Sequence, residues 1–277
     1  MFNFFKKKIG IIGFGNMGSA IAERIKSKYK VFVFERDAAK TEGLTGIKIA
    51  SDIPQLVKQS QAIILAIKPQ DFESVMEEIK DGAQGKLIIS IAAGITTGYI
   101  EKFLGQVRVV RVMPNLAVQV GQSTTSICKG AFADDKDLSF VLKLFKYLGN
   151  VFVLPEAMMD AATAVAGSGP GFWCDLVQGK PKSEWEKYSR EYFIPEFSLA
   201  AEHVGFDKKQ AGLFAASTTT GTIAIVEALR ITPEELKAKV TSKGGTTQAG
   251  LEALHNTGSL IEAVEAAVRR SKELSRG

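Results

Sequence analysis

The chain has little of the side-chain chemistry on which many enzymes depend, with two cysteines and two histidines among 277 residues. Cys128 and Cys174 form neither a C-x-x-C pair nor a metal-ligand spacing, which argues against a disulfide framework and against a zinc site. His203 and His255 lie in segments of helical periodicity, where packing or surface roles are commoner than general acid catalysis. We therefore expect no bound metal, and the scarcity of cysteine favours a cytoplasmic location.

The sequence also lacks long apolar runs and a one-sided charge. No stretch approaches the roughly 18 apolar residues that a membrane span requires, and Phe4-Phe5-Lys6-Lys7-Lys8 places its charges after its apolar residues, the reverse of a signal peptide. The 35 basic and 30 acidic residues give a formal charge of +5 and are interspersed along the chain. This pattern argues against nucleic acid and membrane as partners, and the small excess suits an anionic small ligand or a solvated surface.

The remaining composition, 45% hydrophobic and 23% charged, is that of a globular protein long enough for two domains. From residue 8 to residue 154, short apolar runs alternate with amphipathic helical patterns, which predicts a βαβ series. The runs are almost continuously hydrophobic, as in parallel strands that are covered on both faces. The candidate strands are Ile9–Ile12, Val31–Phe34, Ile47–Ala50, Ala62–Ile67, Leu87–Ile91, Val107–Val112 and Val151–Leu154. We predict an α/β domain with a doubly wound sheet over residues 1–156.

After Pro155 the strand pattern stops and helical periodicity takes over. The candidate helices of this half are Met158–Val165, Leu199–Val204, Gln210–Leu229, Glu234–Val240, Gln248–Leu254 and Leu260–Leu274. We predict an all-α second domain over residues 157–277.

The most informative stretch lies between residues 9 and 25, where an apolar run, a glycine-rich turn and a helical pattern follow one another. The turn reads Gly13-Phe14-Gly15-Asn16-Met17-Gly18 and has the G-x-G-x-x-G spacing of dinucleotide sites. In such sites the first glycine permits a tight turn, the second lets backbone approach a pyrophosphate, and the third lets the helix pack closely on the strand. N–H groups at the helix start then face the phosphates. The stretch predicts a Rossmann-type cofactor site, with a simple strand-to-helix turn as the alternative.

The end of the second candidate strand supports this interpretation. Glu35 follows the glycines by about 20 residues, where an acidic side chain binds a ribose hydroxyl of the cofactor. Glu35 would repel a 2′-phosphate, whereas Arg36 could attract that phosphate or stack on adenine. We therefore expect NADH to be preferred and NADPH to be accepted.

Two loops that follow later strands are further candidates, because ligands of doubly wound sheets bind beyond the carboxyl ends of the strands. These loops are Ala66-Ile67-Lys68-Pro69-Gln70 and Arg111-Val112-Met113-Pro114-Asn115. In each, proline ends the strand and a polar residue lies beside it. We predict cofactor contacts from Ala66, Lys68, Pro69 and Asn115, and the alternative is an ordinary strand-ending turn.

The helical half contains two glycine-bearing loops, Ala166–Pro170 and Val240–Thr247. The second combines hydroxyls, two adjacent glycines and the start of a helix, so its backbone N–H groups and hydroxyls can hold a carboxylate or another small anion. On composition alone, capping of the helix is the commoner role for Thr246 and Thr247.

With these stretches in this order, the chain resembles the pyrroline-5-carboxylate reductases over nearly its whole length. The resemblance is carried by the glycine turn, Ile67–Gln70, Ala92-Ala93-Gly94-Ile95, Arg111–Asn115, Gly167-Ser168-Gly169-Pro170 and Val240–Thr247. It implies a Rossmann domain, a helical domain that dimerises by interweaving helices, and catalysis between the two. It also implies that hydride from a reduced nicotinamide adds to the imine carbon of 1-pyrroline-5-carboxylate, which gives L-proline.

The resemblance assigns roles in Val240–Thr247, here called the signature loop. It implies that the Thr247 hydroxyl bonds the ring nitrogen as the catalytic residue. The residues that would hold the substrate carboxylate, together with the loop backbone, are Ser242, Gly244, Gly245, Thr246 and Thr247. Hydride addition to an imine needs positioning, an anchor for the carboxylate and a partner for nitrogen, so the scarcity of histidine and cysteine is compatible with this chemistry.

Two departures from the family pattern bear on substrate and assembly. Lys243 stands where the family often has proline, which relaxes the backbone and adds a cation near the carboxylate. The stretch from Pro170 to Gly205 is longer than the family pattern requires, and Pro181 and Pro195 should break the helix expected there. Within it, four aromatic residues at helical spacing are expected to pack on the subunit or on a partner subunit. They are Trp185, Tyr188, Tyr192 and Phe193.

We expect a homodimer or a larger oligomer of dimers that acts on a small imino acid. Two other functions stay open: reduction of another cyclic imine or of a keto or hydroxy acid on the same fold, and cofactor sensing without catalysis. The related 3-hydroxyacid dehydrogenases place a catalytic lysine on a helix, and no such pattern is evident. An intact signature loop favours catalysis, because a sensor has no use for a carboxylate cradle.

Overall fold

The computed structural model describes residues 6–275, which divide into two compact units. The first unit comprises residues 6–112 and 127–148, and the second comprises residues 113–126 and 149–275. The chain therefore passes between the units at several points, whereas the sequence predicted a single boundary after residue 156. The difference arises because residues 113–126 associate with the helical half of the chain.

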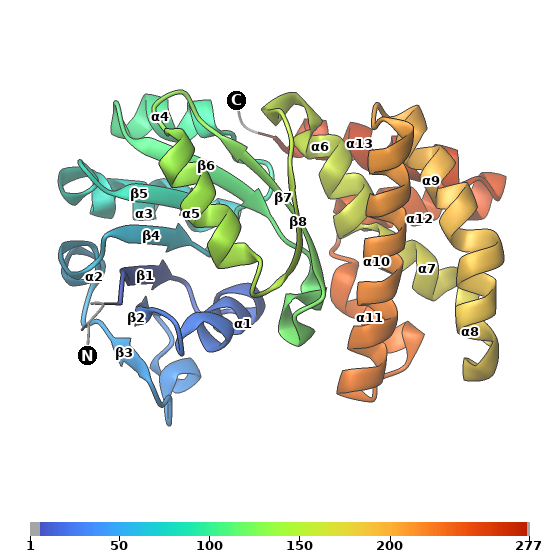
Figure 1. Cartoon of the computed structure of the whole chain (residues 1–277), viewed down its shortest axis with the longest axis horizontal. Coiled ribbons are helices and arrows are strands. Elements are labelled where there is room, and N and C mark those ends of the chain that lie inside the picture. The colour runs from blue at the N-terminus through green and yellow to red at the C-terminus, as the bar shows by residue number, and fades with distance from the viewer. Residues whose placement is uncertain (1–5, 276–277) are drawn as a thin grey trace. The chain divides into compact units, whose positions relative to one another are not determined.

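The first unit is built on parallel strands in the order β3-β2-β1-β4-β5-β6 (Figure 1). Their bounds are β1 Lys8–Ile12, β2 Lys30–Phe34, β3 Ile47–Ile49, β4 Ala62–Leu65, β5 Leu87–Ser90 and β6 Arg108–Met113. The strand order continues with β7, Ser123–Lys129, and β8, Gly149–Val153. The chain order reverses direction in space at β1, which lies between β2 and β4, so a ligand site is expected beyond the carboxyl end of β1. The predicted doubly wound fold is confirmed.

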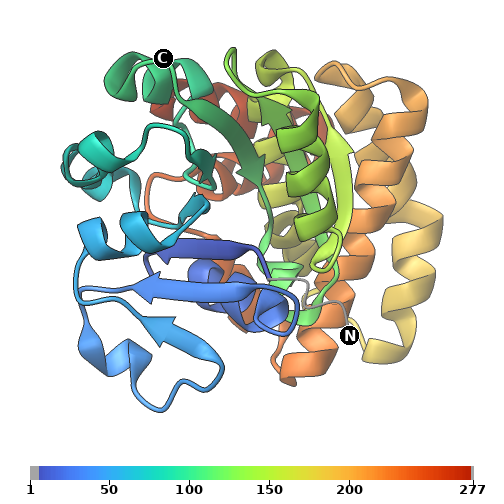
Figure 2. The same ribbon diagram turned by 60° about the vertical axis from the view of Figure 1, so that its left-hand side comes forward.

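Helices cover both faces of this sheet. They are α1 Asn16–Ile25, α2 Ile53–Gln59, α3 Phe72–Ile79, α4 Thr97–Leu104 and α5 Asp135–Phe145. Residues of α2, α3 and α4 share one core with alternate strand residues such as Ile12, Ile63 and Ile88. The intervening strand residues, among them Ile11 and Ile64, are also fully buried, and Figures 1 and 2 show α5 on the opposite side of the sheet from α3.

β7 is the strand that the sequence does not reveal. Its residues Ser123 to Ser126 are hydroxyl-bearing and polar in sequence, yet all four are buried. Three of these hydroxyls are hydrogen-bonded, since Ser123 Oγ and Thr125 Oγ1 lie 2.9 Å apart and Thr124 Oγ1 and Ser217 Oγ 2.7 Å apart, whereas Ser126 Oγ has no hydrogen-bond partner among the described residues. Hydrogen bonding of this kind offsets the desolvation of buried polar groups.

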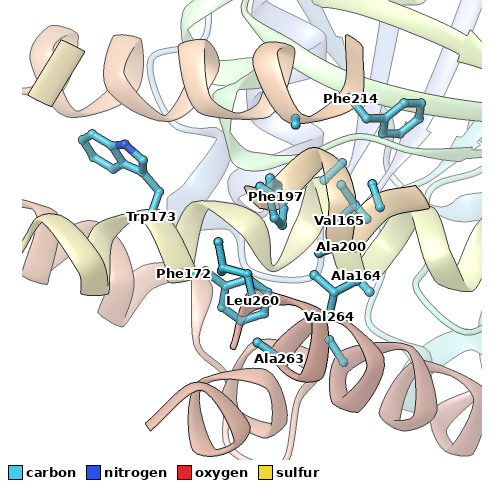
Figure 3. Close-up of a cluster of buried hydrophobic side chains, with 14 of the residues drawn as sticks. Ala164, Val165, Phe172, Trp173, Phe197, Ala200, Phe214, Leu260, Ala263 and Val264 are labelled. Atoms are coloured by element: carbon cyan, nitrogen blue, oxygen red, sulfur yellow. The ribbon is translucent and has the colours of Figure 1, made fainter. Parts of the chain in front are cut away.

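Beyond β8, the second unit is helical, as predicted. Its helices are α6 Met159–Ala162, α7 Gly169–Val177, α8 Lys182–Tyr188, α9 Ile194–His203, α10 Lys208–Leu229, α11 Pro233–Val240, α12 Thr246–Thr257 and α13 Leu260–Leu274. They enclose a core rich in aromatic rings, in which Phe172, Trp173, Phe197 and Phe214 are fully buried (Figure 3). The Phe172 and Phe197 rings meet edge to face with centroids 6.4 Å apart, a geometry that aromatic pairs prefer.

Two expectations for this unit were wrong. The glycine-bearing stretch at 166–170 is not a loop, because a π-helical turn, Thr163–Gly167, leads almost directly into α7. Pro195 does not break the chain's helical course: a second π-helical turn, Ser189–Phe193, precedes it, and the proline lies in the first turn of α9, where a missing N–H is harmless. Pro181 does mark a break, as the residue that caps the start of α8.

The aromatic residues at 185–193 pack mainly within their own unit. Trp185 meets Trp173 edge to face with centroids 5.6 Å apart, and Phe193 is buried against Phe197. Tyr188 stacks on Tyr192 at 5.7 Å, and Tyr192 stays exposed. The expectation of packing on the subunit is thus confirmed for Trp185 and Phe193.

Helix α10 is long and apolar enough to cross a membrane by length and composition alone. The sequence pattern predicts a helix over Gln210–Leu229 but no membrane span, because threonines and a glycine interrupt its apolar residues. Core helices often meet the same criteria, and Phe214, Ala215 and Ile225 of α10 belong to the core of the second unit.

Candidate functional site

The turn between β1 and α1 depends on two of its three glycines. Gly13 has φ +93°, a value that disfavours residues with a side chain, and an added Cβ would lie 2.5 Å from the carbonyl oxygen of Ala66. At Gly18 an added Cβ would overlap the carbonyl oxygen of Gly13. The first and third glycines therefore allow close packing of turn, helix and the end of β4, as their spacing predicted.

Gly15 differs, because an added Cβ would meet no protein atom within 4 Å. Its φ of −73° is open to any residue, so neither packing nor backbone strain explains a glycine at this position. Gly15 caps the start of α1 without a side-chain hydrogen bond, and the first N–H groups of a helix have no partner within it. Open space in front of uncapped N–H groups suits a phosphate.

Glu35 lies at the end of β2, and its carboxylate reaches back to the glycine turn. Its Oε2 accepts a hydrogen bond of 2.7 Å from the Phe14 N–H, and its Oε1 accepts one of 3.1 Å from the Asp37 N–H. Burial alone would raise the pKa of Glu35, but these bonds and the charge of Lys40 outweigh it, so the pKa lies below its ordinary value. The site thus carries a fixed negative charge at neutral pH, with 13% of the side chain exposed.

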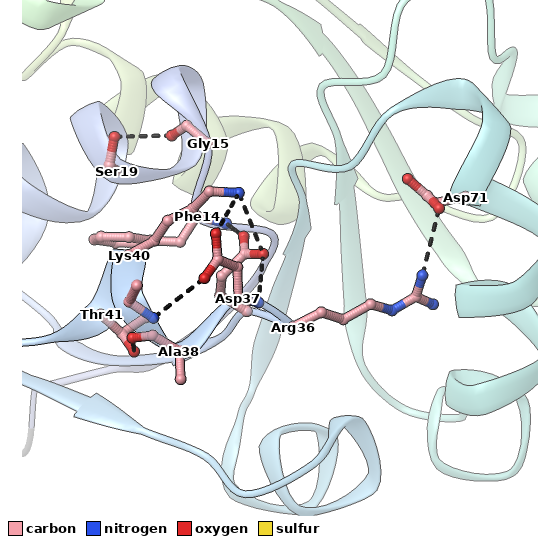
Figure 4. A network of polar contacts seen from close by, with 11 residues as sticks. Phe14, Gly15, Ser19, Arg36, Asp37, Ala38, Lys40, Thr41 and Asp71 are labelled. Carbon is pink, nitrogen blue, oxygen red and sulfur yellow. Dashed lines mark hydrogen bonds and ion pairs between the residues drawn. The ribbon is translucent and has the colours of Figure 1, made fainter.

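Two cations follow Glu35 in the chain: Lys40 lies beside its carboxylate, and Arg36 extends toward Asp71 (Figure 4). Lys40 Nζ lies 3.7 Å from Glu35 Oε1, and Arg36 extends to α3, where Nη1 lies 3.4 Å from Asp71 Oδ1 and Nη2 lies 3.3 Å from Ser74 Oγ. Both cations are about half exposed and are free to turn toward a ligand, since exposed ion pairs contribute little. The sequence analysis named Arg36 but missed Lys40, which no motif marks.

Glu35, Arg36 and Lys40 line a cavity of about 260 Å³ in the first unit. Gly13 and Gly15 lie on its wall, and the loop after β4 closes another side. The cavity therefore gathers the predicted cofactor residues from the ends of β1, β2 and β4, the edge at which doubly wound folds bind ligands.

In the loop after β4, the three predicted residues have different environments. Ala66 packs on the glycine turn, where its Cβ would lie 3.2 Å from a Cβ on Gly18. Lys68 is exposed and lines the cavity, and Pro69 begins a short 3₁₀ turn. The donors and charges of this site fit a dinucleotide, with a phosphate at the start of α1 and a ribose near Glu35.

Asn115 belongs to the second unit. Its Nδ2 donates to the Ala166 carbonyl at 3.1 Å, and its Oδ1 accepts from the Thr124 N–H at 3.2 Å. Both side-chain atoms are thus engaged in fixing the segment between β6 and β7 to the helical unit. The predicted cofactor contact of Asn115 would therefore use the second N–H of Nδ2, the second lone pair of Oδ1 or the backbone carbonyl.

The signature loop turns sharply between α11 and α12. The Gly245 N–H donates to the Ser242 carbonyl at 3.0 Å, and Gly244 has φ +68°, the left-handed conformation that glycine allows. At Gly245 an added Cβ would overlap Ser242 Oγ. Both glycines of the loop are therefore required by its geometry.

Side chains outside the loop hold this turn. Arg270 Nε of α13 donates to the Gly244 carbonyl at 2.7 Å, and the Gly244 N–H donates to Gln248 Oε1 at 2.8 Å. Lys243 is exposed at the tip, and the Thr241 hydroxyl is buried without a hydrogen-bond partner in the described part of the chain. No motif marks Arg270, which lies 26 residues beyond Gly244, and the role of Gln248 depends on the turn that the loop makes.

Neither threonine caps α12, so the capping alternative is wrong. Gly245 is the cap residue, and it has no side chain that could accept from the first backbone N–H groups of this helix. Thr246 Oγ1 accepts a hydrogen bond of 3.0 Å from Ser168 Oγ. Thr247 is 4% exposed, and its methyl group packs so closely on Gly171 that a Cβ there would overlap it. The start of α12 thus offers uncapped N–H groups, as the start of α1 does.

Two protein-family models match the chain. One, described as NADP oxidoreductase, coenzyme F420-dependent, matches residues 8–94. The other, described as pyrroline-5-carboxylate reductase dimerisation, matches residues 191–274. The first match contains the glycine turn, and the second contains the signature loop.

Full-length relatives and solved structures agree with these matches. The chain is 33% identical to a pyrroline-5-carboxylate reductase of Aquifex aeolicus, with 96% of this chain and 97% of the relative covered. It is 34% identical to that of Methanosarcina acetivorans, with 98% of each covered. The structure of a pyrroline-5-carboxylate reductase from Coxiella burnetii is similar with a TM-score of 0.66 and 28% identity, over 99% of this chain and 100% of that one. A pyrroline carboxylate reductase of Plasmodium falciparum with NADP bound is similar with a TM-score of 0.63 and 27% identity, over 98% and 99% of the two chains.

Proposed function

The chain belongs to the pyrroline-5-carboxylate reductase family, and on that premise we propose that it reduces 1-pyrroline-5-carboxylate to L-proline with NAD(P)H, the last step of proline biosynthesis. The observation that carries this proposal is that one chain contains both a dinucleotide cradle and an uncapped, hydroxyl-bearing signature loop. A cofactor site alone would suit many oxidoreductases. The loop adds the chemistry that an amino-acid carboxylate requires.

The reaction needs few groups from the protein. When bound, the reduced nicotinamide supplies a hydride to the imine carbon, and the ring nitrogen ends as an amine. The protein must then orient two reactants, exclude competing water and supply donors to the carboxylate and the nitrogen. The absence of a histidine or cysteine beside either site in the described residues is compatible with these tasks.

The cofactor residues are proposed as follows. The N–H groups at the start of α1 hold the pyrophosphate, and the bare Gly15 lets it approach. Glu35 accepts hydrogen bonds from the adenosine ribose, while Lys40 and Arg36 lie at the rim. Lys68, Pro69 and Asn115 are also proposed to contact the cofactor.

NADH is proposed as the preferred cofactor. Glu35 is ionised and held in place by two backbone N–H groups, so a 2′-phosphate beside it would meet a fixed negative charge. Arg36 and Lys40 can offset part of this repulsion, because both are exposed and weakly paired. NADPH is therefore accepted with lower efficiency.

The substrate residues are proposed from the signature loop. Its backbone donors and the hydroxyls of Ser242 and Thr246 hold the carboxylate, with Gly244 and Gly245 shaping the turn. The Thr247 hydroxyl bonds the ring nitrogen. This role is supported by two observations: the hydroxyl caps no helix, and the side chain is fixed by its packing on Gly171.

A homodimer is proposed as the working form, because the matched family model for residues 191–274 is described as a dimerisation module. Further assembly of dimers and a cytoplasmic location are proposed with it. Light scattering coupled to size-exclusion chromatography tests the assembly, and a mass of one chain across micromolar concentrations would contradict it.

The function is tested by following NADH and NADPH oxidation with 1-pyrroline-5-carboxylate and with a panel of other cyclic imines, keto acids and hydroxy acids. We expect turnover with 1-pyrroline-5-carboxylate and formation of L-proline. A strong preference for another compound of the panel would change the substrate assignment to that compound. If the folded protein shows no turnover with either nicotinamide, the proposed function is wrong.

A further inference from the structure

One side of α7 faces both helices that border the signature loop. α11 ends at Val240, where the loop begins, and α12 begins at Thr246, before the loop ends. The residues of this side recur every three or four positions, as neighbours on one helical face do. They run from the cap before the helix to the cap after it: Ser168, Gly171, Asp175 and Gln178.

The first half of this face touches the loop itself. Ser168 Oγ donates to Thr246 Oγ1 at 3.0 Å. A Cβ on Gly171 would overlap the methyl group of Thr247 and would lie 3.5 Å from Cγ2 of Val240. Both ends of the signature loop therefore rest on the same turn of α7.

The second half of the face ties down the flanking helices through one carboxylate. Lys237 Nζ of α11 donates to Asp175 Oδ1 at 2.9 Å, and His255 Nε2 of α12 lies 2.9 Å from Asp175 Oδ2. Lys237 also donates to Gln178 Oε1 at 2.9 Å. Asp175 thus joins α7, α11 and α12 with its two oxygens, and 14% of its side chain is exposed.

The Asp175 carboxylate is stabilised in its ionised form. Burial alone would raise the pKa of Asp175, but the hydrogen bonds and charges of Lys237 and His255 lower it below the ordinary value. Removal of one partner from such a group leaves the others with an unmatched charge. The bridge therefore links the two helices that carry the loop through one charged group.

We propose that Asp175 is a positioning residue for the substrate site: it holds α11 and α12 at the spacing that aims the signature loop and the Thr247 hydroxyl at the substrate. This inference rests on the proposed function. It predicts that loss of the bridge weakens substrate binding while cofactor binding, which belongs to the first unit, is unchanged.

The chain offers a matched control for this test. It has two histidines, and each is paired with a carboxylate in the second unit. His203 of α9 lies 2.7 Å from Glu265 of α13, so this pair joins neither α11 nor α12, and α13 contacts the signature loop through Arg270 instead. The histidine side chains are 50% and 61% exposed, so His203→Gln and His255→Gln remove comparable pairs.

The experiment compares Asp175→Asn, His255→Gln and His203→Gln with the wild type. We expect the first two to raise KM for 1-pyrroline-5-carboxylate by about five- to 30-fold, with kcat less affected, which corresponds to about 1–2 kcal/mol. The Kd for NADH should stay within about twofold in all three, and His203→Gln should leave KM unchanged. KM near wild type in both bridge variants, or an equal rise in His203→Gln, would overturn the proposal.

Hydrogen exchange of the amides at 241–247 tests the positioning without any turnover. Exchange should be faster in Asp175→Asn and His255→Gln than in His203→Gln, and equal exchange in all three contradicts the inference. Absence of wild-type turnover would remove the proposed function, while the exchange result would still decide the positioning role. His255→Gln carries the test if Asp175→Asn does not fold, because its exposed ring is not part of the core.

Discussion

Replacing Gly15 by alanine separates cofactor binding from folding. The backbone at Gly15, with φ −73° and ψ −166°, accepts alanine without strain, and the new Cβ meets no protein atom within 4 Å. Loss of chain freedom in the unfolded state stabilises the variant by about 0.4–1 kcal/mol. Alanine is a poorer helix cap than glycine by a similar amount, roughly 0.5–1 kcal/mol, so the free energy of unfolding should hardly change.

No comparable gain offsets the effect of Gly15→Ala on cofactor binding. The added methyl group lies where the pyrophosphate approaches the start of α1, and overpacking by a methyl group costs about 1–3 kcal/mol. Since each 1.36 kcal/mol is a factor of about ten, the Kd for NADH should rise by about five- to 150-fold.

The assay is a fluorescence titration of NADH without substrate, paired with thermal unfolding of the same samples. Gly98→Ala is the matched control, because Gly98 lies near the start of α4 and its added Cβ also meets nothing within 4 Å. The control should bind NADH as the wild type does. An unchanged Kd in folded Gly15→Ala would refute the placement of the pyrophosphate at this turn.

Three further predictions follow from the same contacts. Glu35→Ser removes the fixed charge near the ribose and should shift the ratio of kcat/KM values toward NADPH by about tenfold, or 1.36 kcal/mol; an unchanged ratio means that the carboxylate does not face the 2′ position. Thr247→Val keeps the shape of the side chain but removes its hydroxyl, so kcat/KM should fall by about five- to 150-fold, or 1–3 kcal/mol, whereas Thr247→Ser should retain much of it; equal values for the two variants would sink the nitrogen contact. Gly171→Ala forces Thr247 to move and should lower kcat/KM. Its control is Gly212→Ala in α10, where a Cβ meets nothing within 4 Å; this variant should stabilise the helix by about 0.5–1 kcal/mol and leave the kinetics unchanged. Equal kcat/KM values in the two variants would show that the Gly171 contact is unimportant.

The elements of the first unit could be predicted from sequence because their signals are local. Strands β1, β2, β4 and β5 are short, mostly buried and mostly apolar, and the glycine turn follows β1 at the spacing of dinucleotide sites. The sequence did not indicate β7 because its hydroxyl-bearing residues are buried, three of them with hydrogen bonds that a hydropathy pattern does not encode. The same limitation explains why residues 113–126 were not assigned to the helical unit.

In the second unit, glycine and proline residues that usually break helices lie within or at the start of helices. Gly167 and Gly169 suggested a loop, but Gly169 belongs to α7 and lets this helix approach Phe197 closely, as Gly171 does at Thr247. Pro195 is accommodated at a helix start after a π-helical turn. In the candidate sites, the sequence could indicate only residues that lie within motifs; no motif marks Lys40, and Arg270 and Asp175 act across long separations that only the fold brings together.

Isotope transfer tests the proposed activity most directly. Reduced nicotinamide that carries deuterium at the transferring position of C4 is incubated with 1-pyrroline-5-carboxylate and the protein, and the product is analysed by mass spectrometry and NMR. We expect L-proline with one deuterium on the ring carbon that had been the imine carbon. No L-proline, or L-proline without deuterium at that carbon, would contradict hydride transfer from the nicotinamide to the imine.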